Sequence, residues 1–488
     1  MPTSNPAAPP VQPPRPGTPR LADIVKTYDI RGLVDQQLVP EASYALGWAF
    51  ARFVALQGHL RHMPTPSTAQ PRGWQSVVVA HDMRRSSPAL AAAFAAGVNA
   101  AGLDVVHAGL ASTDMLYYAS GTLHMAGAMF TASHNPAQYN GIKLCLPGAA
   151  PVSIDNGLAQ IRDHAQGLLD GHIEQPNAPR GHLFTHDALP GYTAFLRSLV
   201  DLSGIRPLRV VIDAGNGMAG HTVPAMLAGL PLQVDQLYFE LDGDFPNHEP
   251  NPLDPSNLVD LQHAVRTTGA DLGLAFDGDA DRCFVIDEQA NPVSASAITA
   301  LVGTRELAKR PGATVLHNLI TSRAVPEIIA EAGGLPIRTR VGHSLIKATM
   351  ATTGAIFGGE HSAHYYFADF FGADTGMLAA MHVLAALGEQ DRPLSQLVAS
   401  FERYSHSGEI NSTVSDVTTT LGHIQEWALT RGAEIDDLDG LTIALPDRSW
   451  FNVRASNTEP LLRLNVEAPD DATMADLRNQ ILALVRNA

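Results

Sequence analysis

Three aspartates, Asp277, Asp279 and Asp281, stand at alternate positions in the stretch DGDADR. Small residues separate them and apolar runs flank the stretch, which predicts a tight loop between two strands. Three carboxylates held this close repel one another unless a cation is present. Carboxylate oxygens are hard ligands, which favour Mg²⁺, Mn²⁺ or Ca²⁺. The spacing therefore predicts a divalent-metal site at these three residues.

A calcium-binding EF-hand is one alternative for this stretch, and a solvated acidic turn is another. The three aspartates match positions 1, 3 and 5 of an EF-hand loop, and Glu288 falls at position 12. Position 6, however, is Arg282 rather than the glycine that the turn needs, and the flanks are strand-like rather than helical. We therefore favour a metal loop of another type.

The stretch TASHNP, residues 131–136, follows the apolar run AGAMF. Asn-Pro favours a turn, so we expect Ser133 to lie exposed at the carboxyl end of a strand, where α/β proteins bind ligands. A serine in that place, followed by His134, could accept a phosphoryl group. Taken alone, the stretch fits an ordinary turn better.

Two further stretches suit a phosphorylated sugar. In GEHSAH, residues 359–364, Glu360 and Ser362 alternate and can project the same way toward paired sugar hydroxyls. In RASNTEP, residues 454–460, Arg454 stands with two hydroxyls and an amide beside free backbone N–H groups, which together form a nest for an anion such as phosphate. Without their context, both stretches also fit polar turns.

A glycine pattern offers a different function. Gly215, Gly217 and Gly220 fit G-x-G-x-x-G after a strand, and Glu240 lies at about the right distance for a ribose-binding acid. A dinucleotide-binding enzyme is therefore an alternative, which a titration with NAD would test. Beside the other motifs we favour the simpler interpretation, in which the glycines permit a tight strand-to-helix turn.

The elements that would position these stretches repeat along the chain. Residues 76–97, 208–229 and 313–334 each combine a β-branched run, a polar turn and an Ala/Leu-rich helix pattern. The runs are almost wholly apolar, as in parallel strands that are buried on both faces. From about Gly408 onward strands and helices mix without βαβ alternation, which indicates an antiparallel sheet.

We therefore predict an α/β protein with three similar α/β domains in series, followed by a smaller α+β C-terminal domain, around a central active-site cleft. A proline-rich, disordered tail precedes them, and a loop-like insertion is expected at residues 58–76. The expected boundaries are 1–20 for the tail, then 21–180, 181–292, 293–402 and 403–488 for the four domains.

Composition narrows the function classes. The 488 residues carry 49 acidic against 32 basic side chains, a formal charge of −17, which disfavours nucleic acid and anionic membranes as partners. An anionic small substrate would need the cations gathered in one cleft. Cys145 and Cys283 lie in apolar stretches and are expected to be buried free thiols. No apolar run approaches a membrane span and no signal pattern is present, so we expect a cytoplasmic protein.

In this order, KTYDIRG, TASHNP, DGDADR, GEHSAH and RASNTEP resemble the α-D-phosphohexomutase superfamily, specifically its bacterial phosphomannomutase/phosphoglucomutase type. The resemblance runs from about Ile24 to the C-terminus. It implies an enzyme, monomer or homodimer, that uses Mg²⁺ and moves a phosphoryl group between O1 and O6 of a hexose phosphate through a phosphoserine and a hexose 1,6-bisphosphate. Mannose is the expected sugar, with glucose or dual specificity second and glucosamine third.

The resemblance also assigns roles to individual residues. Ser133 matches the phosphorylated serine, whose phosphate joins Asp277, Asp279 and Asp281 as a metal ligand. Lys143 and His364 are the candidates for proton transfer, and a lysine base would need its pKa depressed by neighbouring cations. Arg282 matches an arginine beside the phosphoserine, and His134 matches an active-site histidine. The expected substrate-binding residues are Tyr28, Arg31, His343, Glu360, Ser362, Arg454, Ser456, Asn457 and Thr458.

Overall fold

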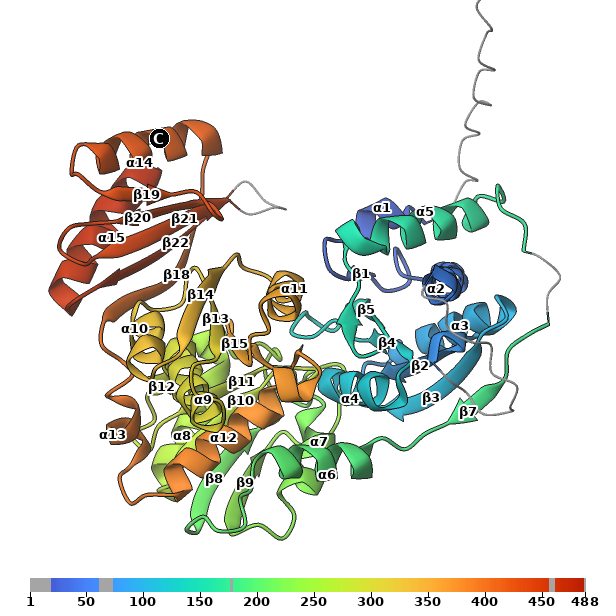
Figure 1. Cartoon of the computed structure of the whole chain (residues 1–488), viewed down its shortest axis with the longest axis horizontal. Helices are drawn as coiled ribbons and strands as arrows, with labels where there is room; N and C mark the ends of the chain where they lie inside the picture. The colour runs from blue at the N-terminus through green and yellow to red at the C-terminus, as the bar shows by residue number, and fades with distance from the viewer. Residues whose placement is uncertain (1–18, 61–72, 176–178, 456–460, 487–488) are drawn as a thin grey trace, which may run out of the picture.

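The computed structural model describes residues 19–60, 73–175, 179–455 and 461–486, except for the side chain of His343. The proline-rich tail and most of the expected insertion lie outside these ranges. Four α/β bodies follow one another along the chain, and the first and last stand on opposite sides of α11 (Figure 1). None of the helices within the described ranges has the length and apolar character of a membrane span.

The first sheet has the order β1-β5-β4-β2-β3-β7, with β6 paired to β5. Its centre is parallel, whereas β5 pairs antiparallel with β4 and β1. The strands are β1 (Ile30–Leu33), β2 (Ser76–His81), β3 (Asp104–Leu110), β4 (Ala126–Phe130), β5 (Tyr139–Leu146), β6 (Ala150–Pro151) and β7 (Leu183–Thr185). The helices are α1 (Leu21–Ile24), α2 (Pro40–Leu60), η1 (Gly73–Gln75), α3 (Ser87–Ala100), α4 (Thr113–Leu123), η2 (Ile154–Asn156) and α5 (Leu158–Leu169).

The second sheet has the order β12-β11-β10-β8-β9 and repeats this plan. Here β8 lies between parallel neighbours β9 and β10, and β11 pairs antiparallel with β10. The strands are β8 (Leu208–Asp213), β9 (Leu232–Leu237), β10 (Leu272–Phe276), β11 (Cys283–Ile286) and β12 (Pro292–Val293). The helices are α6 (Leu189–Leu199), α7 (Ala219–Leu227), η3 (Pro255–Leu258) and α8 (Val259–Thr268).

The third sheet, β14-β13-β15-β16-β17, repeats the plan again, with β13 between its parallel neighbours β14 and β15 and with β16 antiparallel to β15. The strands are β13 (Thr314–Asn318), β14 (Leu335–Thr339), β15 (Phe357–Gly359), β16 (Tyr365–Phe367) and β17 (Ala373–Asp374). The helices are α9 (Ala295–Lys309), α10 (Ala324–Glu331), α11 (His343–Thr353), η4 (Ala368–Phe370), α12 (Gly376–Gly388) and α13 (Leu394–Val398). The three repeated segments of the sequence thus supply β2, β8 and β13, each of which lies between two parallel neighbours, together with the helices that follow them.

The C-terminal body is an antiparallel sheet, β18-β22-β21-β20-β19, with α14 (Val417–Leu429) and α15 (Asp471–Arg486). Its strands are β18 (Ser405–Thr413), β19 (Glu434–Asp436), β20 (Leu441–Ala444), β21 (Trp450–Ala455) and β22 (Leu461–Ala468). The predicted fold class, three similar α/β domains and a smaller α+β domain, is confirmed.

Three details differ from the expected boundaries of the domains and of the insertion. Strand β7 lies beyond residue 181, yet it pairs in parallel with β3 of the first sheet, and β12 spans the expected boundary at residue 292. The expected insertion also begins too early, because α2 continues to Leu60. Gly58 in its last turn lies directly against Trp74, where a Cβ atom would come within 2.7 Å of the tryptophan Cβ.

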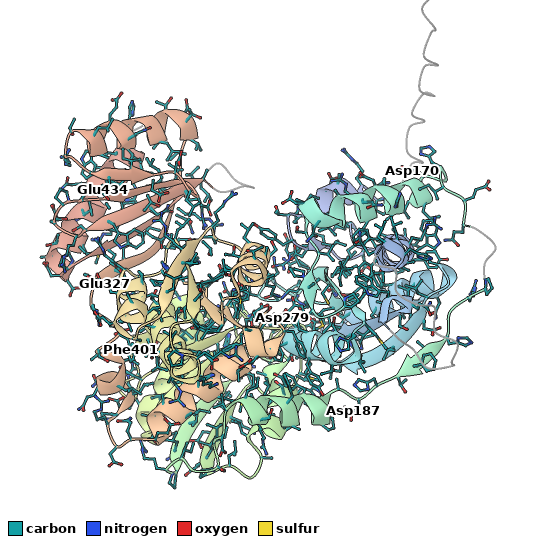
Figure 2. The ribbon with its side chains drawn as sticks, in the orientation of Figure 1. Asp170, Asp187, Asp279, Glu327, Phe401 and Glu434 are labelled. Atoms are coloured by element: carbon teal, nitrogen blue, oxygen red, sulfur yellow. The ribbon has the colours of Figure 1, made fainter. Side chains whose placement is uncertain are left out.

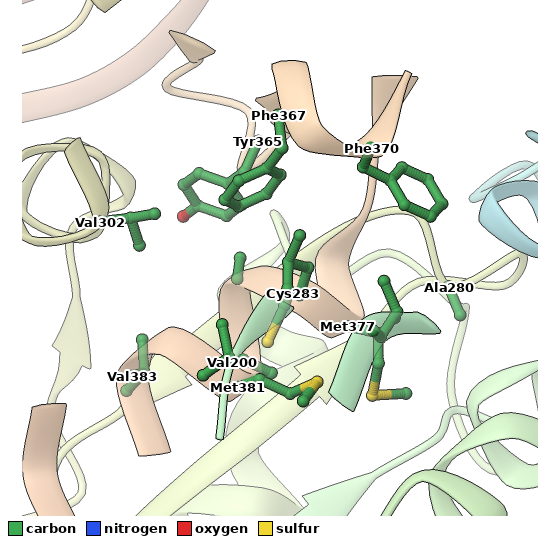
Figure 3. Packing of buried hydrophobic residues seen from close by; sticks show 14 of the residues in the cluster. Val200, Ala280, Cys283, Val302, Tyr365, Phe367, Phe370, Met377, Met381 and Val383 are labelled. Atoms are coloured by element: carbon green, nitrogen blue, oxygen red, sulfur yellow. The ribbon is translucent and has the colours of Figure 1, made fainter. Parts of the chain in front are cut away.

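One hydrophobic core joins the first three domains. It continues from Val78 in the first sheet through Val210 in the second to Val383 in α12. Figure 3 shows its centre, where aromatic rings of the third domain pack near Cys283 and Met377. Cys145 and Cys283 are both buried and free, as predicted. The C-terminal domain has a hydrophobic cluster of its own, which includes Ile424, Phe451 and Ile481.

Candidate active site

Three of the polar stretches occupy the same place in three repeats. Residues 131–138 connect β4 to β5, residues 277–282 connect β10 to β11, and residues 360–364 connect β15 to β16. In each case a parallel strand ends at its carboxyl edge and the chain returns as an antiparallel strand. Asp279 lies where the first domain meets the second and third (Figure 2). The repeated topology explains how stretches far apart in the sequence reach one site.

Ser133 lies directly against residues 277–282, the aspartate loop. Its hydroxyl donates to Oδ2 of Asp277 at 2.7 Å, and its backbone has a left-handed φ of 49°. Gly278 faces the Ser133 carbonyl so closely that a Cβ atom would lie 2.5 Å from that oxygen. The expectation that Ser133 is exposed is wrong, since its exposed fraction is 5%. The aspartate loop from the second domain covers the turn that would otherwise face solvent.

The aspartate loop is a concentrated negative charge. Asp277, Asp279 and Asp281 have exposed fractions of 0%, and one oxygen of each lies within 4.8 Å of the others. Among the described residues, Oδ1 of Asp279 and Oδ1 of Asp281 are buried without a hydrogen-bond partner. Buried carboxylate oxygens without partners are costly, and a hard divalent cation would complete them. The donor set therefore fits the predicted metal.

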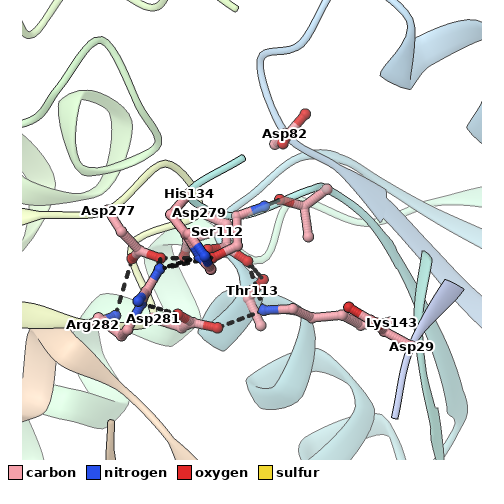
Figure 4. Close-up of polar contacts among 12 residues, drawn as sticks. Asp29, Asp82, Ser112, Thr113, His134, Lys143, Asp277, Asp279, Asp281 and Arg282 are labelled. Atoms are coloured by element: carbon pink, nitrogen blue, oxygen red, sulfur yellow. Dashed lines mark hydrogen bonds and ion pairs between the residues drawn. The ribbon is translucent and has the colours of Figure 1, made fainter. Parts of the chain in front are cut away.

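Lys143, which belongs to the first domain, offsets part of this negative charge. Its ammonium donates to Oδ2 of Asp279 at 2.7 Å and to Oδ2 of Asp281 at 2.6 Å (Figure 4). Burial favours the neutral amine, but the two carboxylates outweigh burial and hold the pKa of Lys143 well above its ordinary value. The neighbours of Lys143 are thus anions, not the cations that a lysine base was expected to need.

Arg282 links the aspartate loop to the phosphoserine candidate. Its guanidinium donates to Oδ2 of Asp277 at 2.8–2.9 Å, to the Ser133 hydroxyl at 3.2 Å and to Nδ1 of His134 at 2.6 Å. Burial and the Arg282 charge hold the pKa of His134 well below its ordinary value. His134 is therefore neutral and accepts at Nδ1. The arrangement gathers a hydroxyl, a carboxylate and a buried cation within hydrogen-bond distance.

The sugar-binding candidate Glu360 is also buried. Its carboxylate accepts from the Tyr366 hydroxyl at 2.5 Å, from Nδ2 of Asn318 at 3.2 Å and from the Gly342 amide at 3.4 Å. Burial raises the pKa of Glu360 above its ordinary value despite these donors. The contacts orient the carboxylate, as a group that recognises sugar hydroxyls requires.

His364 connects the third loop to the aspartates. Its Nδ1 lies 3.0 Å from the Ser362 hydroxyl, and its Nε2 lies 3.8 Å from Oδ1 of Asp281. Its backbone forms an isolated antiparallel bridge with Arg282. Burial lowers the pKa of His364 to about 4. The structure thus brings Ser362 and His364 to the same site as the phosphoserine candidate.

The N-terminal pair has partners in two domains: Arg31 contacts the first domain, and Tyr28 lies against the third. Arg31 forms an ion pair with Asp29 at 2.6 Å and donates to Oδ1 of Asn135 in the phosphoserine loop. The Tyr28 hydroxyl lies so close to Gly342 that a Cβ atom there would be 2.8 Å away. His343 is the first residue of α11, but its side chain lies outside the described residues.

Arg454 lies near the end of β21, and its acidic partners are farther away than the Asp277 partner of Arg282. Its guanidinium lies 3.8 Å from Glu409 and 3.7 Å from Asp439, and its side chain is 15% exposed. After burial, the Arg454 charge is the largest cause that lowers the pKa of His361 to about 3. Arg454 therefore lies near residues 360–364, which carry the sugar-binding candidates. The other predicted phosphate ligands, Ser456, Asn457 and Thr458, lie outside the described residues.

Sequence reasoning missed two residues that support the site. Thr113, the first residue of α4, donates its hydroxyl to Oδ2 of Asp279 at 2.6 Å. Arg84, just beyond β2, donates to the carbonyls of the phosphoserine loop. One signal was available, since Asp82 and Arg84 are charged residues directly after an apolar strand, at the edge where ligand sites lie.

The glycine pattern also contributes to this site. The Met218 amide donates to the Gly278 carbonyl at 2.9 Å, and a Cβ atom on Gly217 would lie 2.7 Å from that oxygen. The turn after β8 thus packs against the aspartate loop from behind. This close packing favours the tight-turn interpretation over a dinucleotide site.

Known protein families match all four domains. Residues 22–168, 190–290 and 294–404 match the models described as phosphoglucomutase/phosphomannomutase alpha/beta/alpha domains I, II and III. Residues 409–484 match the model of the C-terminal domain of the same family.

Individual proteins match along almost their whole length. A protein of Xanthomonas campestris pv. campestris named "Phosphohexose mutases" is 37% identical, over 93% of this chain and 97% of the relative. A phosphomannomutase of Escherichia coli is 37% identical, over 94% and 98%. The crystal structure of a phosphoglucomutase/phosphomannomutase family protein from Burkholderia thailandensis superposes with a TM-score of 0.82 at 30% identity, over 95% of this chain and 97% of that one.

Proposed function

The chain belongs to the phosphoglucomutase/phosphomannomutase family, and from that premise we propose that it interconverts mannose 1-phosphate and mannose 6-phosphate. The observation that carries the proposal is the Ser133 hydroxyl, held 2.7 Å from Asp277 beside two further buried aspartates and Arg282. The names of relatives at 33–37% identity support mannose as the sugar.

In the proposed reaction Ser133 carries the phosphoryl group. The O–P bond to Ser133 breaks as the free hydroxyl of the hexose phosphate forms a new O–P bond, which yields a hexose 1,6-bisphosphate. The hydroxyl loses its proton to a base, and the serine oxygen regains one. The bisphosphate then turns around, and its other phosphoryl group returns to Ser133.

Asp277, Asp279 and Asp281 would hold a Mg²⁺ ion, together with an oxygen of the Ser133 phosphate. When bound, the ion supplies positive charge beside the phosphoryl group, whose transfer depends on positioning and charge neutralisation. Arg282 adds a fixed cation at the same place, 3.2 Å from the Ser133 hydroxyl. Lys143 and His364 remain the candidates for the proton transfers because both reach the aspartate loop, and the raised pKa of Lys143 suits it to returning a proton rather than to removing one.

The remaining groups would bind the sugar and its second phosphate. Glu360 and Ser362 suit two neighbouring hydroxyls, and Arg454 with residues 456–458 suits the distal phosphate. Tyr28, Arg31 and His343 would complete the substrate contacts. If Glu360 and Ser362 hold O3 and O4, they do not distinguish mannose from glucose, which differ at C2. Phosphoglucomutase or dual activity is therefore the second candidate, and phosphoglucosamine mutase is the third.

The test is turnover of mannose 1-phosphate, glucose 1-phosphate and glucosamine 1-phosphate side by side, with Mg²⁺ and a trace of hexose 1,6-bisphosphate. We expect kcat/KM to be highest for mannose 1-phosphate. Equal values for glucose would indicate dual specificity. No turnover of any of the three sugars by the phosphorylated enzyme would refute the proposed function.

A further inference from the structure

Arg84 is a buried arginine that grips the backbone of the phosphoserine loop. Its guanidinium donates to four backbone carbonyl oxygens, three in residues 131–138 and one at the start of β5, and its side chain has an exposed fraction of 1%. The accepting carbonyls belong to Ser133 at 2.9 Å, Asn135 at 2.6 Å, Pro136 at 2.9 Å and Tyr139 at 3.0 Å. One side chain thus fixes both ends of the turn that presents Ser133.

Arg84 is itself held from two domains. The Asp82 carboxylate lies 3.3 Å from its Nε and accepts from its backbone amide at 2.9 Å. From the second domain, the Phe245 ring lies 4.9 Å from the guanidinium carbon. Gly243 packs on the Arg84 backbone so tightly that a Cβ atom would lie 2.6 Å from its Cα. The guanidinium therefore has little room to take another position.

The loop needs such a grip because of its backbone. Ser133 has a φ of 49°, a left-handed conformation that is unfavourable for any residue other than glycine and persists only where the surroundings enforce it. Its carbonyl is turned toward Arg84 while its hydroxyl is turned toward Asp277. Without the guanidinium, a more extended backbone would move the hydroxyl away from the aspartates.

We propose that Arg84 is a positioning residue for phosphoryl transfer, which acts through the backbone of the phosphoserine loop rather than through substrate. The assignment rests on the proposed function for its kinetic readout. Its contacts are the loop carbonyls, Asp82 and Phe245. Loss of Arg84 should therefore slow the transfer step and leave substrate affinity nearly unchanged.

The test compares Arg84→Lys with Arg197→Lys. Lysine keeps the charge but offers a single ammonium that does not span four carbonyls. Arg197 is a matched control because its guanidinium also donates to backbone carbonyls, those of Met226 in the last turn of α7 and Ala228 just after it, outside the site. A displacement of the nucleophile by about 1 Å costs on the order of 100-fold, so we expect kcat of Arg84→Lys to fall about 30- to 100-fold with KM within about threefold.

Arg197→Lys should keep kcat within about twofold of the wild-type value. Its melting temperature should fall about as much as that of Arg84→Lys, because both variants lose hydrogen bonds from a guanidinium to backbone carbonyls. Hydrogen exchange of the peptide 131–139 should accelerate only in Arg84→Lys. Equal kcat losses in the two variants, or a loss that appears only in KM, would overturn the assignment.

If Arg84→Lys does not fold, Phe245→Leu provides the test, because it removes only the ring over the guanidinium. We then expect a smaller fall in kcat and faster exchange of the peptide 131–139, whereas unchanged exchange would overturn the assignment. Hydrogen exchange needs no substrate. An inactive wild-type enzyme would therefore refute the proposed function alone, while the exchange result would still decide the role of Arg84.

Discussion

The two ends of the candidate site are built in different ways. At the reacting end, Ser133 and the three aspartates are buried and held at 2.6–2.9 Å by partners from two domains. At the distal end, Arg454 is 15% exposed and its acidic partners lie 3.7–3.8 Å away. The first arrangement leaves a reacting atom little freedom, and the second leaves a cation available to a ligand.

The domain packing shows the same contrast. The first three domains share one hydrophobic core and meet at Asp114, which accepts from Tyr192 of the second domain at 2.6 Å and from Thr375 of the third at 2.7 Å. The C-terminal domain has a separate core, and its contacts with the third domain include polar ones, such as the Arg323 amide on Glu467 at 2.9 Å.

A two-step phosphoryl transfer gives this difference a reason. The reacting end handles the same bond in both steps and gains from a fixed geometry. In the proposed reaction the distal end would bind the phosphate on C1 in one step and the phosphate on C6 in the other. A loosely paired arginine on a separately packed domain can accommodate both orientations. The comparison predicts that changes at the reacting end affect kcat, whereas changes at the distal end affect KM.

Ser133→Ala should have the largest effect. We expect kcat to fall by at least about 1,000-fold, because the covalent carrier of the phosphoryl group is lost. Mg²⁺ binding, measured by calorimetry, should persist because the aspartates remain. A variant with a near-normal mutase rate would refute the covalent route. It would also contradict the expectation that the reacting end determines kcat.

Asp281→Asn should be next. It removes one negative charge from the three aspartates. In the described part of the chain, Oδ1 of Asp281 has no hydrogen-bond partner. We expect kcat to fall about 100-fold or more and Mg²⁺ affinity to fall about 10- to 100-fold. Chelation of the wild-type enzyme should abolish turnover, and added Mg²⁺ should restore it. Full activity in the presence of a chelator would contradict a metal at this site.

Asp114→Asn tests whether the first three domains are joined as firmly as the packing indicates. Burial raises the pKa of Asp114 to about 6, against 3.8 in the unfolded chain. The folded state therefore binds the proton more tightly, and this stabilisation is present below about pH 4 and lost as pH rises through 6.

The amide does not titrate, so the free energy of unfolding of Asp114→Asn should improve relative to wild type by about 2–3 kcal/mol between pH 4 and pH 7. Urea unfolding at several pH values measures this difference. A difference that is independent of pH would show that folding does not raise the pKa of Asp114.

Arg454→Lys probes the distal end. Lysine keeps the charge but loses the planar fork that binds phosphate through two hydrogen bonds. We expect kcat/KM to fall about 10- to 100-fold, mainly through KM. Steady-state kinetics with the 1-phosphate and the 6-phosphate should show similar losses. A loss confined to kcat would contradict the division of labour between the two ends.

Local patterns in the sequence predicted the parts of this architecture that depend on neighbouring residues. The three βα segments, the metal loop and the antiparallel last domain follow from runs of apolar side chains and from turn chemistry. The direction of β5, β11 and β16 does not follow from such patterns, because an apolar strand has the same sequence pattern in parallel and antiparallel pairs. The edge strand β7 has only three residues and no apolar alternation.

Residues that act across domains were the hardest to predict. Arg84 and Asp114 interact with partners up to 261 positions away, as between Asp114 and Thr375, and no local pattern marks such pairs. The burial of Ser133 depends on Gly278 from another domain. By contrast, Lys143 and Arg282 were identified through the family resemblance. A family motif marks residues that meet in the folded protein, and one sequence without that comparison does not mark them.

Asp439→Asn should have the smallest effect, and its direction sharpens the comparison. Asp439 accepts from the Val341 amide at 3.1 Å and lies 3.7 Å from Arg454, so it docks the last domain and would compete with a phosphate for Arg454, the cation that we propose binds it. Partly exposed ion pairs at this distance contribute less than about 1 kcal/mol. We expect KM to fall about twofold as Arg454 becomes more available, with kcat unchanged and a weaker dependence of KM on salt. A rise in KM above about threefold would mean that Asp439 positions Arg454 instead of competing for it, and the distal end would then be as firmly built as the reacting end.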